Sequence, residues 1–172
     1  MPSPGTPLLI VFGGLPGTGK TTIARELSRR LRASYVRIDT IEQSLRAAGL
    51  AVGAMGYVIA NAVAGENLRI GRVVVTDSVN PVLASRDGWR ETARKNAARL
   101  VEIEVICSDA SEHRKRVESR LADINGLVQP SWQDVVSRAY EPWDREPVVL
   151  DTAKDSIDRL VDRIETLIGD KG

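Results

Sequence analysis

The sequence contains a single cysteine, Cys107, and a single histidine, His113, among its 172 residues. One cysteine cannot form an internal disulfide, which excludes the disulfide framework of a small secreted domain and a cysteine-rich zinc site. A surplus of one charge sign is also lacking, because 24 Lys and Arg residues balance 23 Asp and Glu residues for a net charge of +1. This balance argues against a dedicated nucleic-acid or membrane-surface binder.

Long apolar runs are missing as well, since none approaches the roughly 18 residues of a membrane span. The opening residues lack the basic start of a signal peptide, so we predict a cytoplasmic protein without a membrane partner. A composition of 42% hydrophobic and 27% charged residues is ordinary for a globular protein and excludes disorder, collagen and coiled coil as the main state. We expect a flexible tail over residues 1–7 and a single domain over 8–172.

Short apolar runs alternate with helical patterns along the whole chain. Strands are predicted at 8–12, 35–38, 72–76, 101–107 and 148–150, and helices at about 20–32, 40–48, 57–69, 86–98, 110–121, 132–139 and 155–168. Such alternation indicates a three-layer α/β/α fold, in which helices cover both faces of a parallel sheet. Cys107 ends the fourth strand and is predicted to be an inert core thiol.

A phosphate-binding motif follows the first predicted strand. A complete G-x-x-x-x-G-K-T sequence stands between that strand and a predicted helix, as its mechanism requires. Its glycines let backbone N–H groups surround phosphate oxygens, and the helix N-terminus adds partial positive charge. Lys20 is expected to reach the β- and γ-phosphates of ATP, and the Thr21 hydroxyl to bind Mg²⁺. The predicted nucleotide-binding residues are Gly14, Leu15, Pro16, Gly17, Thr18, Gly19, Lys20, Thr21 and Thr22.

The loop indicates nucleotide binding but does not specify the reaction, because ATPases, GTPase switches and small phosphotransferases all use it. The N-K-x-D sequence that reads guanine is absent. An ATPase module of the AAA type is expected to be longer and to carry a helical lid domain. The length therefore favours a phosphotransferase, whose reaction needs mainly positioning and charge neutralisation.

Two carboxylates are expected near the phosphate loop, because ligands of an open parallel sheet bind outside the carboxyl ends of its strands. Asp39 directly follows the second predicted strand, and Asp77 directly follows the third. Asp39 is our candidate for the base or the group that orients the acceptor, with capping of the next helix as the alternative. Asp77 is our candidate for holding magnesium through water and for the acceptor site, with a plain turn residue as the alternative.

Polar residues farther along the chain offer further candidates, each with an ordinary structural alternative. Arg116 and Arg120 lie one turn apart on a predicted helix and could neutralise transition-state charge, or belong to a merely solvated helix. Asn80 and Arg86 could form part of an acceptor pocket, although Asn80-Pro81 is also a turn signal. His113 stands among charged residues and is predicted to be exposed.

The combined motifs resemble a known family. The phosphate loop, the acid at 39, the run at 73–75 and the Tyr-Glu-Pro sequence at 140–142 resemble the small-molecule kinases of the nucleotide-kinase-like P-loop group. Adenylylsulfate kinase and gluconate kinase are the most similar in layout, over about residues 8–168. Chloramphenicol phosphotransferase and shikimate kinase are more distant.

This resemblance implies a five-stranded parallel sheet in the order 2-3-1-4-5, a mobile lid after strand four over about 114–138, and ATP with Mg²⁺ as the donor. It also implies that Asp39 is the family's acidic residue after strand two, that Arg86 contacts the acceptor, that Arg116 and Arg120 enter the lid, and that Thr152 lies near the adenine. No D-G-D-N sequence follows strand two, and the lid lacks the histidine-phenylalanine pair of gluconate kinase. The resemblance therefore leaves the acceptor open.

Functions of different classes remain. The first is an ATP-dependent kinase that moves the γ-phosphate to a hydroxyl of a small metabolite, antibiotic or nucleotide, as a monomer or homodimer. The second is a nucleotide-binding regulatory module with weak ATPase activity, which a large exposed apolar patch would favour. A kinase of nucleic-acid 5′ ends shares the fold and is expected to show a basic track to Asp39, for which Arg37 and Arg46 are thin support.

Overall fold

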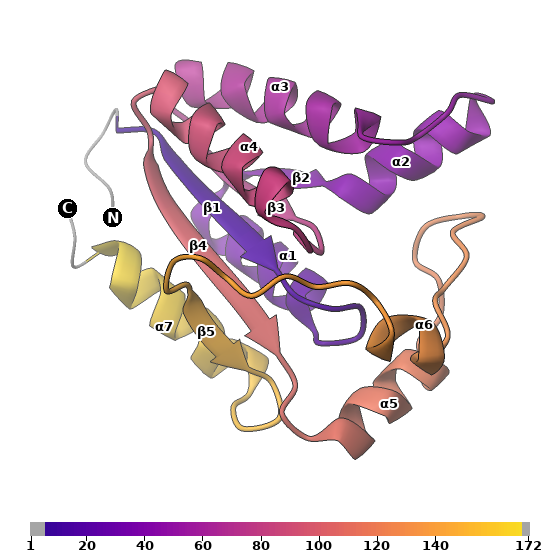
Figure 1. The fold of residues 1–172 in the computed structure, drawn as a ribbon. Coiled ribbons are helices and arrows are strands. Elements are labelled where there is room, and N and C mark those ends of the chain that lie inside the picture. Colours follow the sequence, from indigo (N-terminus) through magenta and orange to yellow (C-terminus); the bar gives the residue numbers. More distant parts are fainter. Residues whose placement is uncertain (1–5, 170–172) are drawn as a thin grey trace.

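Two layers of helices enclose one parallel sheet in the computed structural model, which describes residues 6–169 (Figure 1). All strands pair in parallel in the order β2-β3-β1-β4-β5, which confirms the predicted fold class. The strands are β1 (Leu8–Gly13), β2 (Ser34–Arg37), β3 (Val73–Asp77), β4 (Arg99–Ile106) and β5 (Val148–Asp151). The helices are α1 (Lys20–Leu31), α2 (Ile38–Ala47), α3 (Met55–Arg69), α4 (Leu83–Lys95), α5 (Ala110–Ser119), α6 (Trp132–Val136) and α7 (Ile157–Gly169).

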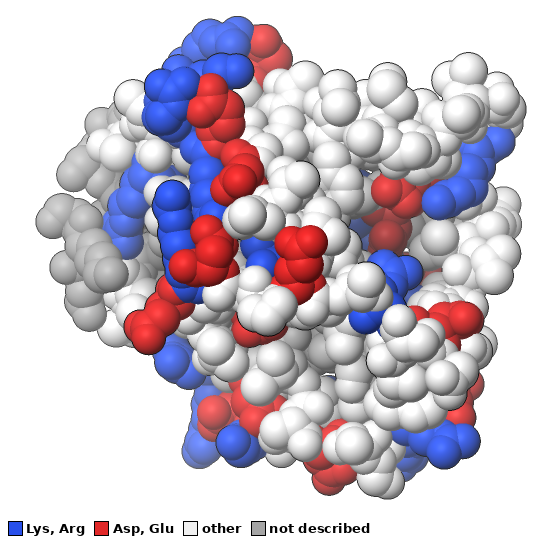
Figure 2. Space-filling model, viewed as in Figure 1, with Lys and Arg blue, Asp and Glu red and all other residues white. Residues whose placement is uncertain are grey.

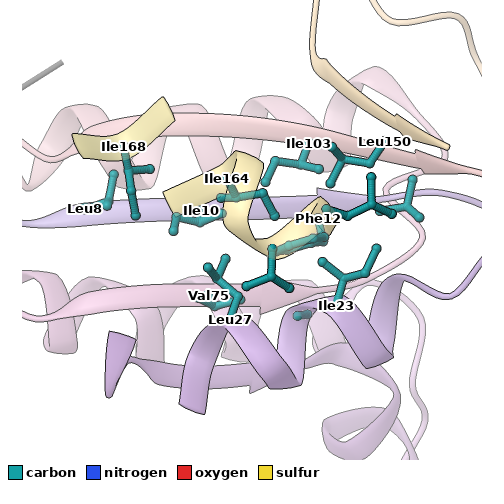
Figure 3. Packing of buried hydrophobic residues seen from close by; sticks show 14 residues of the cluster. Leu8, Ile10, Phe12, Ile23, Leu27, Val75, Ile103, Leu150, Ile164 and Ile168 are labelled. Atoms are coloured by element: carbon teal, nitrogen blue, oxygen red, sulfur yellow. The ribbon is translucent and has the colours of Figure 1, made fainter. Parts of the chain in front are cut away.

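Strand β1 is buried on both faces and separates two hydrophobic clusters. Leu8, Ile10 and Phe12 pack with side chains of α1 and α7, as Figure 3 shows, whereas Leu9 and Val11 pack with α3 and α4. A continuous apolar run is the pattern expected of a strand buried on both sides. This packing fixes β1 at the centre of the sheet, so the phosphate loop emerges at the middle of the carboxyl edge.

The strand register gathers three segments of the predicted site at that edge. Phe12 of β1 stands opposite Asp77 of β3, and Arg37 of β2 also stands opposite Asp77. The phosphate loop, the end of β3 and the start of α2 are therefore neighbours, although they lie far apart in the sequence.

Two element boundaries at this edge differ from the prediction. Strand β2 ends at Arg37, which is the N-cap of α2, so Asp39 lies inside the first helical turn and does not cap it. A carboxylate in the first turn still interacts favourably with the helix dipole. Asp77 does not follow β3 but is its last residue.

Part of the predicted tail and of the domain's end, residues 1–5 and 170–172, lies outside the described residues. The described end of that tail joins the sheet, because the Pro7 carbonyl accepts a hydrogen bond from the Arg99 N–H at 3.0 Å. Within residues 6–169, no helix is both long and apolar enough to cross a membrane.

Candidate nucleotide-binding site

The phosphate loop connects β1 to α1 through backbone conformations that require glycine. Gly14 has a φ of 139°, and a Cβ at this position would lie 2.3 Å from the carbonyl oxygen of Val105. Gly19, the N-cap of α1, has a φ of 94° and no side chain that could bond the first N–H groups of the helix. The start of α1 therefore has no side-chain cap, which is the place where an anion can bind a helix.

Lys20 begins α1 and is buried beside the loop. Burial lowers the pKa of Lys20, whereas the negative charges of Asp77 and Asp39 act in the opposite direction. The ammonium group thus lies in a poorly solvated position near two carboxylates, where a phosphate oxygen can compete for it as a charge-assisted hydrogen-bond partner.

A cavity of about 360 Å³ opens beside Lys20 and Thr21. Its walls come from the phosphate loop, α2, α3, the segment after β3 and the segment between α5 and α6. Five cationic side chains and two carboxylates line it, so the lining carries a positive excess. These residues are Lys20, Arg37, Arg46, Arg120, Arg138, Asp39 and Glu42.

Asp39 shares this cavity with Lys20 and Thr21, and its side chain is 41% exposed. Its carboxylate accepts a hydrogen bond from the Arg37 Nη2 at 3.4 Å. Asp39 is therefore an accessible carboxylate that lines the same cavity as Lys20, as the base hypothesis requires.

Asp77 has a different environment, because it is only 2% exposed and does not line the cavity. Its Oδ2 accepts a hydrogen bond from the Tyr35 hydroxyl at 2.7 Å and lies 3.7 Å from the Arg37 Nε. Burial and the Asp77 charge raise the pKa of Tyr35, so the phenol stays a donor. Asp77 thus supplies negative charge near Lys20 and does not offer the cavity an open carboxylate.

Magnesium prefers oxygen ligands and keeps several waters in proteins. The Thr21 hydroxyl lines the cavity, and carboxylates lie near it. Within the described part of the chain, no group of three or more His, Cys, Asp and Glu side chains could hold a metal ion. This donor set fits a Mg²⁺ held chiefly by phosphate oxygens and water, with one protein hydroxyl, and not a cage of protein ligands.

Arg37 lines the cavity, although the sequence offered it only as thin support for a basic track. Its buried guanidinium donates two hydrogen bonds to Asp123, at 2.6 and 3.2 Å, and Arg25 lies 2.7 Å from the same carboxylate. The hydrogen bond from Arg37 lowers the pKa of Asp123 to about 2, against the opposing effect of burial. Because Asp123 lies between α5 and α6, this ion pair ties the predicted lid to the end of β2. The position of Arg37 at the carboxyl end of a predicted strand was the sequence feature that could have identified it as a residue of the cavity.

The two predicted lid arginines lie beside the phosphate loop. Both line a smaller cavity next to Gly17 and Gly19, and Arg120, which also donates a hydrogen bond to Gln129, reaches the larger cavity as well. Burial lowers the pKa of Arg120, and its guanidinium stays charged in proteins. Arg116 donates to the hydroxyl of Thr152 at 2.8 Å, and that hydroxyl donates to the Thr18 carbonyl at 2.6 Å.

Residues 9–142 match the family model described as an AAA domain. The chain belongs to this AAA-domain family. The match identifies the type of domain and does not specify its reaction.

One curated relative of this AAA-domain protein is 25% identical over 94% of the chain and 92% of the relative, a probable adenylyl-sulfate kinase of Aeropyrum pernix. The Mycobacterium tuberculosis APS kinase in complex with AMPPNP and APS has a TM-score of 0.70 and 17% identity, over 96% of this chain and 99% of that one. Chaetomium thermophilum Kti12 in complex with ADP-AlF3 has a TM-score of 0.69 and 24% identity, over 93% of this chain and 98% of that one. The two structures show that the fold is shared.

Asn80 and Arg86 of the AAA-domain chain lie in the interior, and neither lines the cavity. The Asn80 side chain donates to the Phe12 carbonyl at 2.9 Å and accepts from the Trp89 indole at 3.0 Å. Arg86 is fully buried, donates to the carbonyls of Asn80, Glu141 and Pro142, and stacks 4.4 Å from the Trp143 ring centroid. These bonds use the groups that an acceptor would need, so the expected acceptor contacts are replaced by a structural role.

Two further expectations for this AAA-domain chain are wrong. His113 is 7% exposed rather than a surface residue, and its Nε2 lies 2.8 Å from the Pro16 carbonyl oxygen of the phosphate loop. The spacing of His113 and the buried Val117, one turn apart on α5, was the signal for an inner face on this polar helix. Cys107 is partly exposed and follows β4, so it is not a core thiol.

Proposed function

We propose that this protein is an ATP-dependent phosphotransferase that moves the γ-phosphate to a hydroxyl of a small acceptor carrying an acidic group. The observation that carries the proposal is the cationic cavity beside Lys20 and Thr21, in which Asp39 is an accessible carboxylate. A volume of about 360 Å³ is in the range of small-molecule sites.

Each group of residues around the cavity has a separate task in the proposed reaction. The phosphate-loop N–H groups and Lys20 hold the ATP phosphates, and Thr21 provides a hydroxyl for Mg²⁺, which would neutralise phosphate charge when bound. Asp39 accepts or orients the proton of the acceptor hydroxyl. Arg120, which reaches both cavities, is placed to stabilise charge on the transferring group.

The acidic group of the acceptor follows from the cations that lie away from the phosphate loop. Arg46 of α2 and Arg138 after α6 line the same cavity, with only Glu42 as an additional carboxylate on that side. Burial raises the pKa of Glu42. Glu42 accepts a hydrogen bond from Arg46 at 3.3 Å, so it offsets part of that charge, whereas Arg138 adds positive charge to the same wall. A carboxylate, sulfate or phosphate on the acceptor would be bound by such arginines.

The relatives support a kinase reaction without defining its acceptor. The similar proteins include a probable adenylyl-sulfate kinase and an APS kinase with AMPPNP and APS bound. Both names describe those proteins, and they favour ATP as the phosphate donor here.

A second candidate, a nucleotide-binding regulatory module, is favoured by one observation. Residues 47–65 contain no charged side chain, and Met55, Val58 and Val63 of α3 are 43–56% exposed. Figure 2 shows a mostly uncharged surface over this half of α3 and its connection to α2. Kti12, a neighbour by fold, was solved with ADP-AlF3. In this case ATP hydrolysis would not depend on any small acceptor.

The deciding experiment measures ATP consumption with purified protein, Mg²⁺ and a panel of hydroxyl compounds in matched acidic and neutral forms. We expect an acidic compound to raise the rate well above the acceptor-free rate, with a phosphorylated product visible by mass spectrometry. An Arg46→Ala/Arg138→Ala double variant should raise the acceptor KM while leaving ATP affinity unchanged. A rate that no small compound or nucleic-acid 5′ end alters would contradict the kinase proposal and favour the regulatory module.

A further inference from the structure

His113 makes a contact that the proposed chemistry does not use. It lies on the inner face of α5, and its Nε2 is 2.8 Å from the Pro16 carbonyl oxygen. A carbonyl can only accept, so the imidazole must carry its proton on Nε2 and donate it. The ring also packs edge-on against Trp132 of α6, with centroids 5.1 Å apart and an interplanar angle of 83°. His113 therefore joins the phosphate loop to both helices of the predicted lid, α5 and α6.

The carbonyl that His113 holds belongs to a peptide group with two available orientations. Leu15 to Thr18 form a turn closed by the Thr18 N–H and the Leu15 carbonyl, with Pro16 and Gly17 at its centre. Gly17 has a φ of 82°, the value of the third residue in a type II turn. Rotation of the Pro16–Gly17 peptide by about half a turn gives a type I turn, which both residues also tolerate. Sequence alone therefore leaves this peptide free to flip.

The orientation of this peptide decides where the Gly17 N–H points. The C=O and N–H bonds of a trans peptide point to opposite sides, and no cis peptide is present among the described residues. With the Pro16 carbonyl held against α5, the Gly17 N–H points away from α5. Gly17 itself fits tightly there, since a Cβ would lie 2.5 Å from Val117 and 3.4 Å from the His113 ring.

We propose that His113 is a positioning residue that fixes the Pro16–Gly17 peptide, so that the Gly17 N–H faces the nucleotide phosphates. The inference rests on the proposed function only in taking the loop as an ATP site. His113 touches neither nucleotide nor acceptor and acts through the loop. Because the same ring packs on Trp132, movement of the lid helices is transmitted to this one peptide group.

Two variants separate the hydrogen bond from the packing. His113→Phe keeps a ring against Trp132 but removes the donor, whereas His113→Gln places an amide N–H at about the reach of Nε2. We expect His113→Phe to weaken ADP and ATP binding in calorimetry by roughly 3- to 10-fold, the effect of one lost hydrogen bond. His113→Gln should stay within about twofold of the original protein. Lys115→Gln, an exposed change on the same helix, serves as the control.

The amide signal of Gly17 in nucleotide-free protein gives a readout independent of activity. We expect this signal to shift or broaden in His113→Phe and to keep its position in His113→Gln. If His113→Phe does not fold, His113→Asn, whose amide is too short to reach Pro16, takes its place. Equal nucleotide affinity in the Phe or Asn variant and the original protein would overturn the proposal, as would equal loss in the Phe and Gln variants. Original protein that binds no nucleotide would instead refute the proposed function.

Discussion

At the scale of single residues, burial distinguishes the two acids that were predicted near the phosphate loop. Asp39 and Asp77 are both acids at the carboxyl edge, yet one is accessible in the cavity and the other is 2% exposed beneath Tyr35. The sequence predicted both acids near the loop, because strand ends converge there. It could not rank them, because their exposure depends on Tyr35 and Arg37 from a neighbouring strand.

Lys20→Ala should remove most of the affinity for ATP. The lysine lies beside the phosphate loop, and a hydrogen bond to a charged group is worth about 1.5–3 kcal/mol, so calorimetry should show a loss of roughly 10- to 150-fold. The fold should survive, because the variant removes a desolvated charge whose pKa burial already lowers. Unchanged affinity in the folded variant would refute the assignment of the loop.

Arg86→Ala should destabilise the protein by at least about 3 kcal/mol, measured by urea unfolding, because three carbonyls lose their buried donor. Arg114→Ala on the exposed face of α5, where the arginine side chain is 60% exposed, is the matched control and should have little effect. If Arg86 contacted the acceptor instead, stability would hold and only the acceptor KM would rise.

At the scale of elements, hydrophobic periodicity predicted the type and order of strands and helices, and the errors fall at the ends of elements near the site. Strand β2 ends at Arg37 and α2 begins at Ile38. Because Ile38 continues the apolar pattern of the strand, the sequence predicted a strand that ended one residue too late. Helix α5 reads as polar and solvated, yet His113 and Val117 on its inner face cover the phosphate loop. The segment between α5 and α6 reaches the cavity through Leu127, Val128 and Pro130.

Asp123→Asn should loosen this segment. The change removes the ionic tie of Asp123 to Arg37 and Arg25, so amide exchange over about 120–130 should accelerate in nucleotide-free protein. In the original protein, exchange over the predicted lid, about 114–138, should slow when an ATP analogue binds. Glu118→Gln, which affects only an exposed ion pair with Arg114, is the control.

The same ion pair fixes the expected pH dependence of the lid. The pKa of Asp123 in the folded protein is lowered to about 2 from its ordinary value of 3.8. The stabilisation that ionised Asp123 gives to the folded segment is therefore fully present above about pH 4. It is lost as the pH falls from about 4 to about 2. Exchange of the segment should therefore not respond to pH through this group between pH 5 and 8. Release of the segment within that range would contradict the role of Asp123.

At the scale of the whole molecule, the sequence predicted the complete sheet order through the family resemblance and the phosphate loop through its motif. The cationic lining of the cavity, where we propose that the acceptor binds, was harder to predict. Its cations come from the end of β2, from α2 and from both sides of α6, and only folding brings them together. Asn80 and Arg86 are polar residues of the kind that binds substrates, but folding buries them. Asn80 donates a hydrogen bond to the Phe12 carbonyl, and Arg86 donates to the carbonyls of Glu141 and Pro142.

The most direct test compares Asp39→Asn with the original protein in two assays, ATP binding by calorimetry and phosphate transfer to the acceptor found by the screen. The variant keeps the size of the side chain, so ATP binding and thermal stability should hardly change. Transfer should fall by roughly 10²- to 10⁴-fold, the range for loss of a general base. Near-normal transfer by a folded Asp39→Asn variant would contradict the account of the cavity as the place where the acceptor hydroxyl meets its base.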